Sequence, residues 1–287
     1  MPYSTQLIVL GSTSFLGKSI PEQLLREYDE VISYSSSNCD LASESSTLSA
    51  SQSWKSGCHI LFFSVINKPI DNSEFAYEKN LSFARNVAKA ANSCKADAVL
   101  FSSSVDVYGN SPNLPIDEDS RLEPDSWYAR AKAESETLLS KELHPRCSLG
   151  IFRCGGMYDL TVGDISVVGK FYKTAKSGGL IALHNQGRNL RDFSLASDII
   201  VLFRYWLRSP RTGIWNAISG TSLTMADIAE IIVNEVGAGS ISKLGGDQRD
   251  FDIAFDARSL IKTYGQNPIR PANLSLPIQI KKQQPQN

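Results

Sequence analysis

The first half of the chain alternates short apolar runs with longer amphipathic segments. The apolar runs are typical of buried strands, and they comprise residues 6–10, 30–34, 60–63, 98–101 and 149–153. Between them, apolar residues recur every three or four positions, which predicts helices, most clearly over residues 74–93. Strands that alternate with helices form parallel sheets with right-handed crossovers. We therefore expect an α/β fold with a doubly wound parallel sheet of the Rossmann type.

A glycine turn follows the first apolar run. The run ends at Gly11, and Gly17 follows six residues later. From Phe15 to Tyr28 apolar residues recur at helical spacing, which predicts one helix directly after the turn. A strand, a glycine turn and a helix form the context of a dinucleotide-binding loop, in which the helix N-terminus receives the pyrophosphate. Ser14 stands where a third glycine is expected.

The end of the second predicted strand bears on the choice of cofactor. An acidic residue at this place binds the adenosine ribose of NAD and repels the 2′-phosphate of NADP. The chain has Tyr34-Ser35-Ser36-Ser37-Asn38 there, without a carboxylate. Hydroxyl and amide groups can surround a phosphate, so the sequence favours NADP, with NAD as the alternative.

Residues 33–56 are rich in serine, which is typical of linkers. Leu41, Leu48 and Trp54 supply apolar anchors within this stretch, and a predicted buried strand follows at once. We expect short connections and a poor helix inside a domain, with disorder over residues 43–53 as the alternative.

Tyr128 and Lys132 place a phenol and an ammonium group four residues apart at the start of a predicted helix. Residues at this spacing share one helix face. A tyrosine that exchanges protons at neutral pH needs a pKa about 3 units below its ordinary value, which corresponds to roughly 4 kcal/mol. One cation at ~4 Å in a partly screened site supplies about that much. We therefore expect Lys132 to lower the pKa of Tyr128.

The rhythm changes after residue 154. The pattern predicts helices over 167–175, 197–208, 224–236 and 256–264, with short strands over 180–183 and 214–217. Thr224 and Asp227 have the spacing of a capping box. We expect residues 1–154 to form the dinucleotide-binding domain, with 191–216 and part of 250–265 returning to it. Residues 155–287 would form mainly a smaller, discontinuous substrate-binding α/β region.

Composition excludes several classes of protein. The chain of 287 residues is 42% hydrophobic and 21% charged, and its net charge of -1 gives no general attraction to nucleic acid or to a membrane surface. Five scattered cysteines without a Cys-x-x-Cys pair favour a reducing compartment. Three dispersed histidines give no metal-ligand spacing, so no metal is assigned. Without a signal peptide or a long apolar segment, a soluble cytoplasmic protein is expected.

Taken in order, the motifs resemble the extended short-chain dehydrogenase/reductase family, in its nucleotide-sugar epimerase, dehydratase and reductase group. The resemblance runs from about residue 6 to about residue 270. The motifs that carry it are the glycine loop Gly11–Gly17, the pair Asp40-Leu41 after a third strand, a strand end at Ser64, Asn80, the serine signature Ser102–Gly109, the pair Tyr128 and Lys132, Arg153, and Arg191-Asp192-Phe193 with Asp198. Gly156 and Asp159 depart from the family pattern, at an asparagine and a glycine position.

The resemblance implies roles for individual residues. It makes Tyr128 the general acid or base, with Lys132 lowering the pKa of Tyr128 and holding the nicotinamide ribose, and with Ser104 hydrogen-bonding the substrate oxygen. The implied cofactor-binding residues are Gly11, Ser14, Phe15, Leu16, Gly17, Ser35, Ser36, Asp40, Leu41, Ser64 and Asn80, together with Tyr128 and Lys132. It also implies a homodimer and a nucleotide sugar as the small-molecule substrate.

Among the reactions of this group, the sequence favours an NADP(H)-dependent reductase of a keto sugar attached to a nucleotide. Epimerases and dehydratases commonly keep the ribose-binding carboxylate, and dehydratases carry an acidic pair beside the active-site hydroxyl, where this chain has only Asp106. An NAD-dependent nucleotide-sugar epimerase is the first alternative. Gly156 leaves a reductase of a non-sugar ketone open. A non-catalytic NADP-binding protein ranks lowest, because Ser104, Tyr128 and Lys132 are all present.

Overall fold

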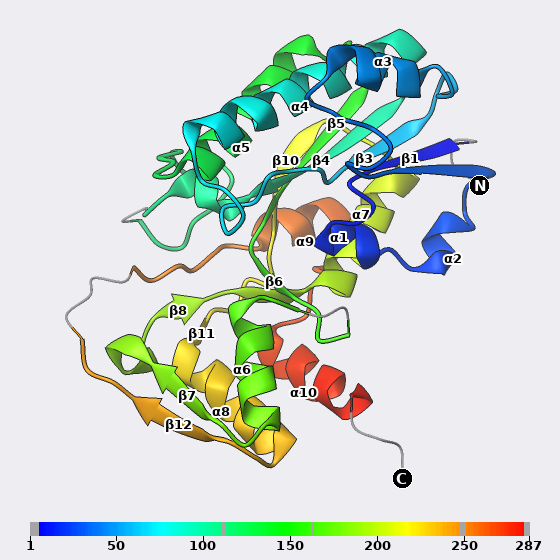
Figure 1. Cartoon of the computed structure of the whole chain (residues 1–287). Coiled ribbons are helices and arrows are strands. Elements are labelled where there is room, and N and C mark those ends of the chain that lie inside the picture. The colour runs from blue at the N-terminus through cyan, green and yellow to red at the C-terminus, as the bar shows by residue number, and fades with distance from the viewer. Residues whose placement is uncertain (1–5, 111–112, 162–163, 247–250, 284–287) are drawn as a thin grey trace. The chain divides into compact units, whose positions relative to one another are not determined.

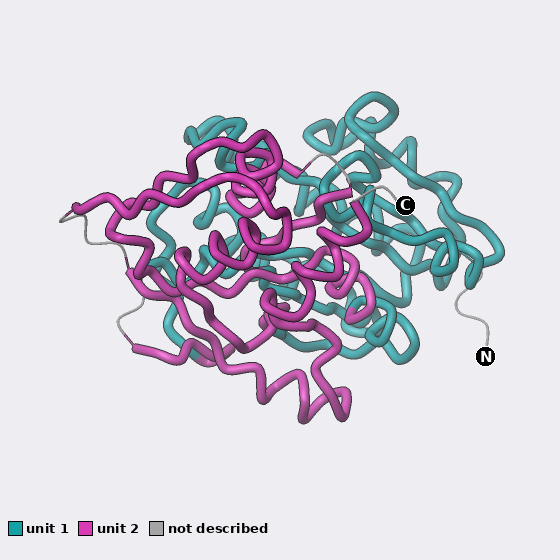
Figure 2. Tube along the Cα trace, turned by 90° about the horizontal axis from the view of Figure 1, so that it is seen from below, with its two compact units in different colours: residues 1–111, 120–154, 203–215 teal, residues 112–119, 155–202, 216–287 magenta. Residues whose placement is uncertain are grey.

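The computed structural model describes residues 6–110, 113–161, 164–246 and 251–283 (Figure 1). The chain divides into two compact units, coloured separately in Figure 2. Unit 1 comprises residues 1–111, 120–154 and 203–215, and unit 2 comprises residues 112–119, 155–202 and 216–287. Of the later segments that the sequence suggested could return to the first domain, residues 203–215 belong to unit 1, whereas 191–202 and 251–265 belong to unit 2.

Unit 1 is built on a six-stranded sheet in the order β10-β5-β4-β3-β1-β2. Its strands are β1 (Gln6–Leu10), β2 (Glu30–Tyr34), β3 (His59–Phe62), β4 (Ala98–Ser104), β5 (Ser148–Cys154) and β10 (Gly213–Ala217). β1 pairs in parallel with β2 and β3, β3 pairs in parallel with β4, and β4 with β5. The predicted doubly wound α/β fold is confirmed.

Helices cover both faces of this sheet. They are α1 (Phe15–Lys18), α2 (Glu22–Leu25), α3 (Glu44–Ser51), α4 (Glu74–Cys94), α5 (Trp127–Glu142) and the second half of α7 (Ala196–Arg208). Figure 1 shows α3, α4 and α5 over one face and α1 and α7 over the other. On the α7 side, the ring of Phe203 lies 5.7 Å from that of Phe63 and 5.0 Å from that of Phe152.

In two segments of unit 1, the observed helices can be compared with the helices predicted from the sequence. The single helix predicted from Phe15 to Tyr28 is wrong, because Pro21 separates α1 from α2; proline lacks the N–H group and disfavours helical backbone at the preceding residue. The serine-rich stretch contains the predicted helix, α3, whose N-cap Ser43 accepts a hydrogen bond from the Ser46 N–H group at 3.2 Å. Disorder over residues 43–53 is therefore excluded.

The strand order fixes where a ligand would bind. The chain leaves β1 for β2 on one side and then crosses to β3 on the other side, so the winding reverses between β1 and β3. In open α/β sheets, ligands bind beyond the carboxyl ends of the strands at this reversal. The pair Asp40-Leu41 follows β2 directly, so the third strand that the resemblance placed before it is not present between residues 35 and 58.

Unit 2 consists of three two-stranded sheets and several helices. Its strands are β6 (Gly156–Tyr158) with β9 (Phe193–Leu195), β7 (Leu180–Leu183) with β12 (Ser240–Lys243), and β8 (Leu190–Arg191) with β11 (Leu223–Thr224). Its helices are α6 (Val167–Lys176), the first half of α7, α8 (Met225–Val236), α9 (Arg258–Tyr264), α10 (Ala272–Lys282) and the short 3-10 turn η2 (His184–Gly187). The predicted capping box of Thr224 and Asp227 is confirmed.

One helix of unit 2 was not predicted. α10 contains Pro277, a residue type that disfavours a helix interior, and the helix is held by the buried side chains of Leu276 and Ile280. Within the part of the chain that the structure describes, no helix is long and apolar enough to cross a membrane.

Candidate functional site

The glycine turn after β1 passes close to the segment that follows β3. Gly11 has a φ of +92°, and a Cβ added to it would lie 2.7 Å from the backbone nitrogen of Ser64. A Cβ on Gly17 would collide with the carbonyl oxygen of Gly11. Both positions thus require glycine, one for its backbone conformation and both for the close approach of the backbone. The loop lies at the reversal of the sheet, as a dinucleotide-binding loop does.

Ser14 takes the position of the expected third glycine because it caps α1. Its hydroxyl accepts a hydrogen bond from the Gly17 N–H group at 3.1 Å, and its φ of -68° needs no glycine. The N–H groups of Phe15 and Leu16 are the first two of α1 and have no acceptor within the helix. They are the donors that this turn can offer to a phosphate.

The end of β2 is tied to the same loop. The N–H groups of Gly11 and Ser12 both donate to the carbonyl oxygen of Tyr34, each at 2.9 Å. The next residues form a polar turn, in which the Ser35 N–H group donates to the Asn38 side chain at 2.7 Å. Ser36 is exposed at this turn. The turn lies beside the loop and carries no carboxylate.

Two predicted cofactor residues, Asn80 and Asp40, have their polar side chains engaged within the protein, and a third, Leu41, is buried. The Asn80 amide accepts from the Ile66 N–H group at 2.8 Å and donates to the Ile66 carbonyl at 3.1 Å. Asp40 accepts from the Ala42 N–H group, and the Leu41 side chain is buried. Asn80 therefore positions the loop that begins at Ser64.

The start of α5 is fixed by two side chains. The Ser126 hydroxyl accepts from the Ala129 N–H group at 3.2 Å, as an N-cap does, and the Asn72 side chain accepts from the Tyr128 N–H group at 3.0 Å. The predicted helix start is confirmed, and Tyr128 lies in the first turn.

Three consecutive serines of β4 meet three residues on one face of α5. Ser104 forms a side-chain hydrogen bond with Tyr128. The Lys132 ammonium group donates to the Ser102 carbonyl oxygen at 2.6 Å, and the Ser103 hydroxyl donates to Glu136 at 2.5 Å. The structure thus brings Ser104, Tyr128 and Lys132 together.

The electrostatics of Tyr128 differ from the expectation. Burial raises the pKa of the Tyr128 phenol, the negative charge of Asp106 raises it further, and the hydrogen bond with Ser104 opposes this shift. The expected lowering by Lys132 is wrong for the protein alone, because the ammonium group is directed at the Ser102 carbonyl and lies 6.0 Å from the centroid of the tyrosine ring. Tyr128 is therefore a neutral phenol at neutral pH.

Lys132 is itself strongly buried, with 3% of its surface exposed. Burial lowers the pKa of Lys132 to about 8, while Cys154 and Glu136 act in the opposite direction. Its ammonium group lies 4.7 Å from the centroid of the Phe101 ring. Near neutral pH, Lys132 supplies a positive charge within the site.

Glu136 and Arg153 also belong to this cluster, although the sequence did not show the contact between them. Glu136, four residues beyond Lys132, was not singled out, although its spacing places it on the same helix face. Arg153 is one of the residues that carry the family resemblance, and the sequence assigns it no role. The structure makes it the partner of Glu136, with a guanidinium nitrogen 2.7 Å from the carboxylate and both side chains buried.

The sequence and fold were compared with known proteins. Residues 7–217 match the model of the "NAD dependent epimerase/dehydratase family". The chain belongs to this family. Membership supports the predicted nicotinamide dinucleotide as the class of cofactor.

Several dTDP-glucose 4,6-dehydratases are among the relatives of this chain, at low sequence identity. The dTDP-glucose 4,6-dehydratase of Streptomyces niveus is 25% identical over 177 residues, which cover 61% of this chain and 52% of that protein. The chain spans about half the length of the curated relatives that it matches first.

Two solved structures share the fold at low identity. The UDP-N-acetylglucosamine 4-epimerase from Bacillus cereus matches with a TM-score of 0.81 and 17% identity, over 99% of this chain and 98% of that one. The GDP-mannoheptose C4 reductase MlghC from Campylobacter jejuni, with NADP bound, matches with a TM-score of 0.79 and 14% identity, over 93% and 94%.

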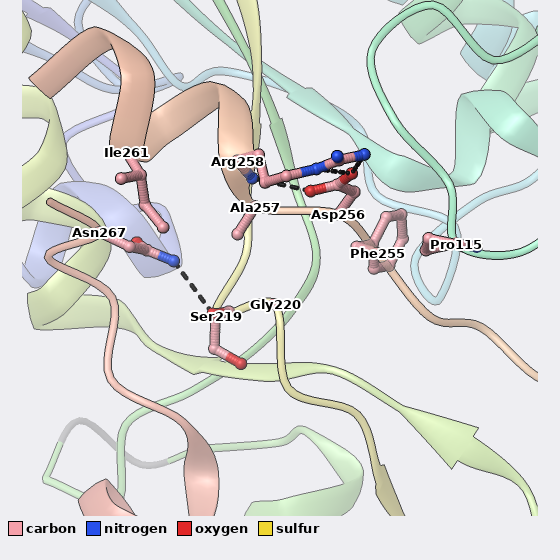
Figure 3. Close-up of a pocket in the computed structure, with 9 residues that line it drawn as sticks. All are labelled: Pro115, Ser219, Gly220, Phe255, Asp256, Ala257, Arg258, Ile261 and Asn267. Carbon is pink, nitrogen blue, oxygen red and sulfur yellow. Dashed lines mark hydrogen bonds and ion pairs between the residues drawn. The ribbon is translucent and has the colours of Figure 1, made fainter. Parts of the chain in front are cut away.

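This family member also has a pocket of about 500 Å³ within unit 2 (Figure 3). Its wall is formed by Pro115, Ser219, Gly220, Phe255, Asp256, Ala257, Arg258, Ile261 and Asn267. Arg258 forms an ion pair with Asp256, and the Asn267 amide donates to the carbonyl groups of Ile218 and Ser219. None of the predicted site residues lines this pocket, and the side chains of Ser219, Arg258 and Asn267 are engaged in bonds within the protein, so we assign the chemistry to the cluster around Tyr128.

Proposed function

We propose that the protein is an NADP(H)-dependent reductase that acts on a keto sugar attached to a nucleotide. When bound, the reduced cofactor supplies a hydride to the carbonyl carbon. Tyr128 gives its phenolic proton to the oxygen that becomes an alkoxide, and Ser104 donates a hydrogen bond to that same oxygen. Lys132 holds positive charge beside the nicotinamide ribose.

The observation that carries this proposal is the cluster of Ser104, Tyr128 and Lys132 at the ends of β4 and α5. The phenol of Tyr128 is protonated at neutral pH, so it carries the proton that the reduction of a ketone requires.

The cofactor site of the proposal lies at the glycine turn and the end of β2. The N–H groups of Phe15 and Leu16 would hold the pyrophosphate, and Gly11 and Gly17 let the backbone come close to it. The polar turn Ser35–Asn38 would surround the 2′-phosphate of NADP, where a carboxylate would repel it. MlghC, a C4 reductase with NADP bound, shares the fold and is consistent with this choice.

An NAD-dependent nucleotide-sugar epimerase is the second candidate. The turn Ser35–Asn38 contains no basic residue, whereas arginine is the usual partner of a 2′-phosphate. The similarity in fold to UDP-N-acetylglucosamine 4-epimerase supports this alternative as well. We propose a homodimer for either enzyme, as the resemblance implies.

The two candidates make different demands on the cofactor. We would incubate the purified protein with nucleotide-linked keto sugars and either NADPH or NADH, and follow the loss of absorbance of the reduced nicotinamide. The reductase predicts consumption of one NADPH for each product formed, with NADH much less effective. A protein that carries stoichiometric bound NAD, and that interconverts nucleotide sugars without net consumption, is an epimerase.

A further inference from the structure

The face of α5 that carries Tyr128 and Lys132 continues for one more turn to a third polar residue. Tyr128, Lys132 and Glu136 follow one another at a spacing of four residues, so their side chains lie in one row along the helix. All three point to the carboxyl end of β4, where each meets one serine. The proposed mechanism uses the first two residues and gives Glu136 no part.

The Glu136 carboxylate is held in place by hydrogen bonds from two side chains. Its carboxylate accepts from Arg153 Nε at 3.1 Å and from Arg153 Nη2 at 2.7 Å, and it accepts from the Ser103 hydroxyl at 2.5 Å. Its exposed fraction is 4% and that of Arg153 is 3%. The register of β4 and β5, which pairs Ser103 with Arg153, presents both donors to the same carboxylate.

Arg153 is itself fixed on its other side. Its Nη1 donates to the Tyr108 hydroxyl at 2.8 Å, and its guanidinium carbon lies 4.9 Å from the centroid of the Tyr108 ring. Tyr108 ends the 3-10 turn η1 (Val105–Tyr108), which begins directly after Ser104. The network thus runs from the turn beside Ser104, through Arg153 and Glu136, back to the helix face that carries Lys132.

A buried ammonium group needs a nearby negative charge to remain ionised. The groups that face Lys132 are the Tyr128 phenol and Glu136 on its own helix, Cys154 and Arg153 on β5, and Asp106 on η1 beyond Tyr128. The Cys154 thiol is neutral near pH 7, since burial raises its pKa to about 12. Glu136 is then the charged group that opposes the burial of Lys132.

We propose that Glu136 is a positioning residue of the catalytic site: its carboxylate, held by the ion pair with Arg153, keeps Lys132 charged and directed at the Ser102 carbonyl. The effect of Glu136 on catalysis rests on the proposed function. The charge state of Lys132 is a property of the protein alone, and it can be measured without a substrate.

The first measurement is the titration of Lys132 by NMR, on the full chain with isotope-labelled lysine, between about pH 6 and pH 10. The Lys132 signal is assigned by its loss in Lys132→Met. The wild type should titrate at about pH 8. Glu136→Gln keeps the shape and removes the charge, and it should shift the midpoint down by about one pH unit or more, as expected for a charge one helical turn away in a partly screened site.

The matched control is Ser103→Ala, which removes one hydrogen bond to Glu136 and leaves the charge in place. Its Lys132 midpoint should stay at the wild-type value. Glu136→Gln leaves Arg153 buried without its partner, which is destabilising and can prevent folding. The double variant Glu136→Gln with Arg153→Met removes both charges, and its Lys132 midpoint should still fall, by less than in Glu136→Gln, because the positive charge of Arg153 is lost as well.

A Lys132 midpoint that is unchanged in the double variant would overturn the proposal, and so would an equal shift in Ser103→Ala. The second measurement is the pH profile of kcat/KM for NADPH-dependent reduction, whose alkaline limb should move down by the same amount as the NMR midpoint. If Lys132 shifts as expected but no keto sugar is reduced by the wild type, the proposed function fails and the positioning role of Glu136 stands.

Discussion

Replacement of Tyr128 by phenylalanine tests the proton donor directly. The substitution removes one hydroxyl group and keeps the ring, so the packing around α5 is retained. The phenol pKa is raised by burial and by Asp106, which means that the hydroxyl is protonated throughout the neutral range. A positioned general acid contributes about 10²- to 10⁴-fold to a rate. We therefore expect kcat to fall by about that factor, equivalent to roughly 3 to 5 kcal/mol of transition-state stabilisation.

The assay is the initial rate of NADPH oxidation with the preferred keto sugar, combined with NADPH binding followed by nicotinamide fluorescence. Binding should change little, because the glycine turn that would hold the pyrophosphate is untouched. The matched control is Tyr77→Phe on the neighbouring helix α4, which removes a hydroxyl that donates to Glu134 of α5 at 2.7 Å. Tyr77→Phe should retain turnover. Undiminished turnover in Tyr128→Phe, or equal losses in both variants, would refute the assigned role.

Three further predictions concern the surroundings of the site. Ser14→Ala removes the cap of α1, so it should lower the unfolding free energy by about 1 kcal/mol in denaturant unfolding and weaken NADPH binding in a fluorescence titration. Its control Ser43→Ala uncaps α3 and should lower the unfolding free energy by a similar amount, but it should leave NADPH binding unchanged. Asp106→Asn removes a charge that raises the pKa of Tyr128, so the alkaline ionisation of this phenol, followed by ultraviolet difference absorbance against Tyr128→Phe, should move to lower pH; an unmoved midpoint contradicts the placement of Asp106. Burial lowers the pKa of His59 from 6.5 to about 4, so between these pH values the unfolded chain binds a proton that the folded chain does not. The unfolding free energy should therefore decline as the pH falls from about 6.5 to about 4, by up to roughly 3 kcal/mol. In His59→Gln this decline should be smaller, and an identical decline would show that other groups cause it.

Local patterns were sufficient to predict the strands and the helix starts of the first unit. The five apolar runs became β1 to β5, and the capping box of Thr224 and Asp227 lies where their spacing placed it. The pair of Tyr128 and Lys132 was found for the same reason, because helical spacing alone puts both on one face. Features that depend on a few neighbouring residues are therefore available from the sequence.

Features that depend on how distant strands pair in the sheet could not be predicted from the sequence. The register of β4 against β5 places Arg153 beside Ser103 and creates the buried pair with Glu136, and no local pattern specifies this register. The shift of the Tyr128 pKa was predicted in the wrong direction, because the prediction used only the helical spacing between Tyr128 and Lys132. The burial of the phenol and the direction of the Lys132 ammonium group come from tertiary packing. Ser14 as the cap of α1 also required the observed geometry, because the sequence marks it only as a missing glycine.

The fate of the transferred hydride tests the central claim most directly. We would supply NADPH that carries deuterium at the transferable position, together with the keto sugar that the protein accepts, and measure the nucleotide-sugar product by mass spectrometry. The account predicts one deuterium in each product molecule, with an equal amount of NADP formed. A product without deuterium, formed while the cofactor pool stays unchanged, would contradict net reduction and identify a cofactor that is recycled within the site.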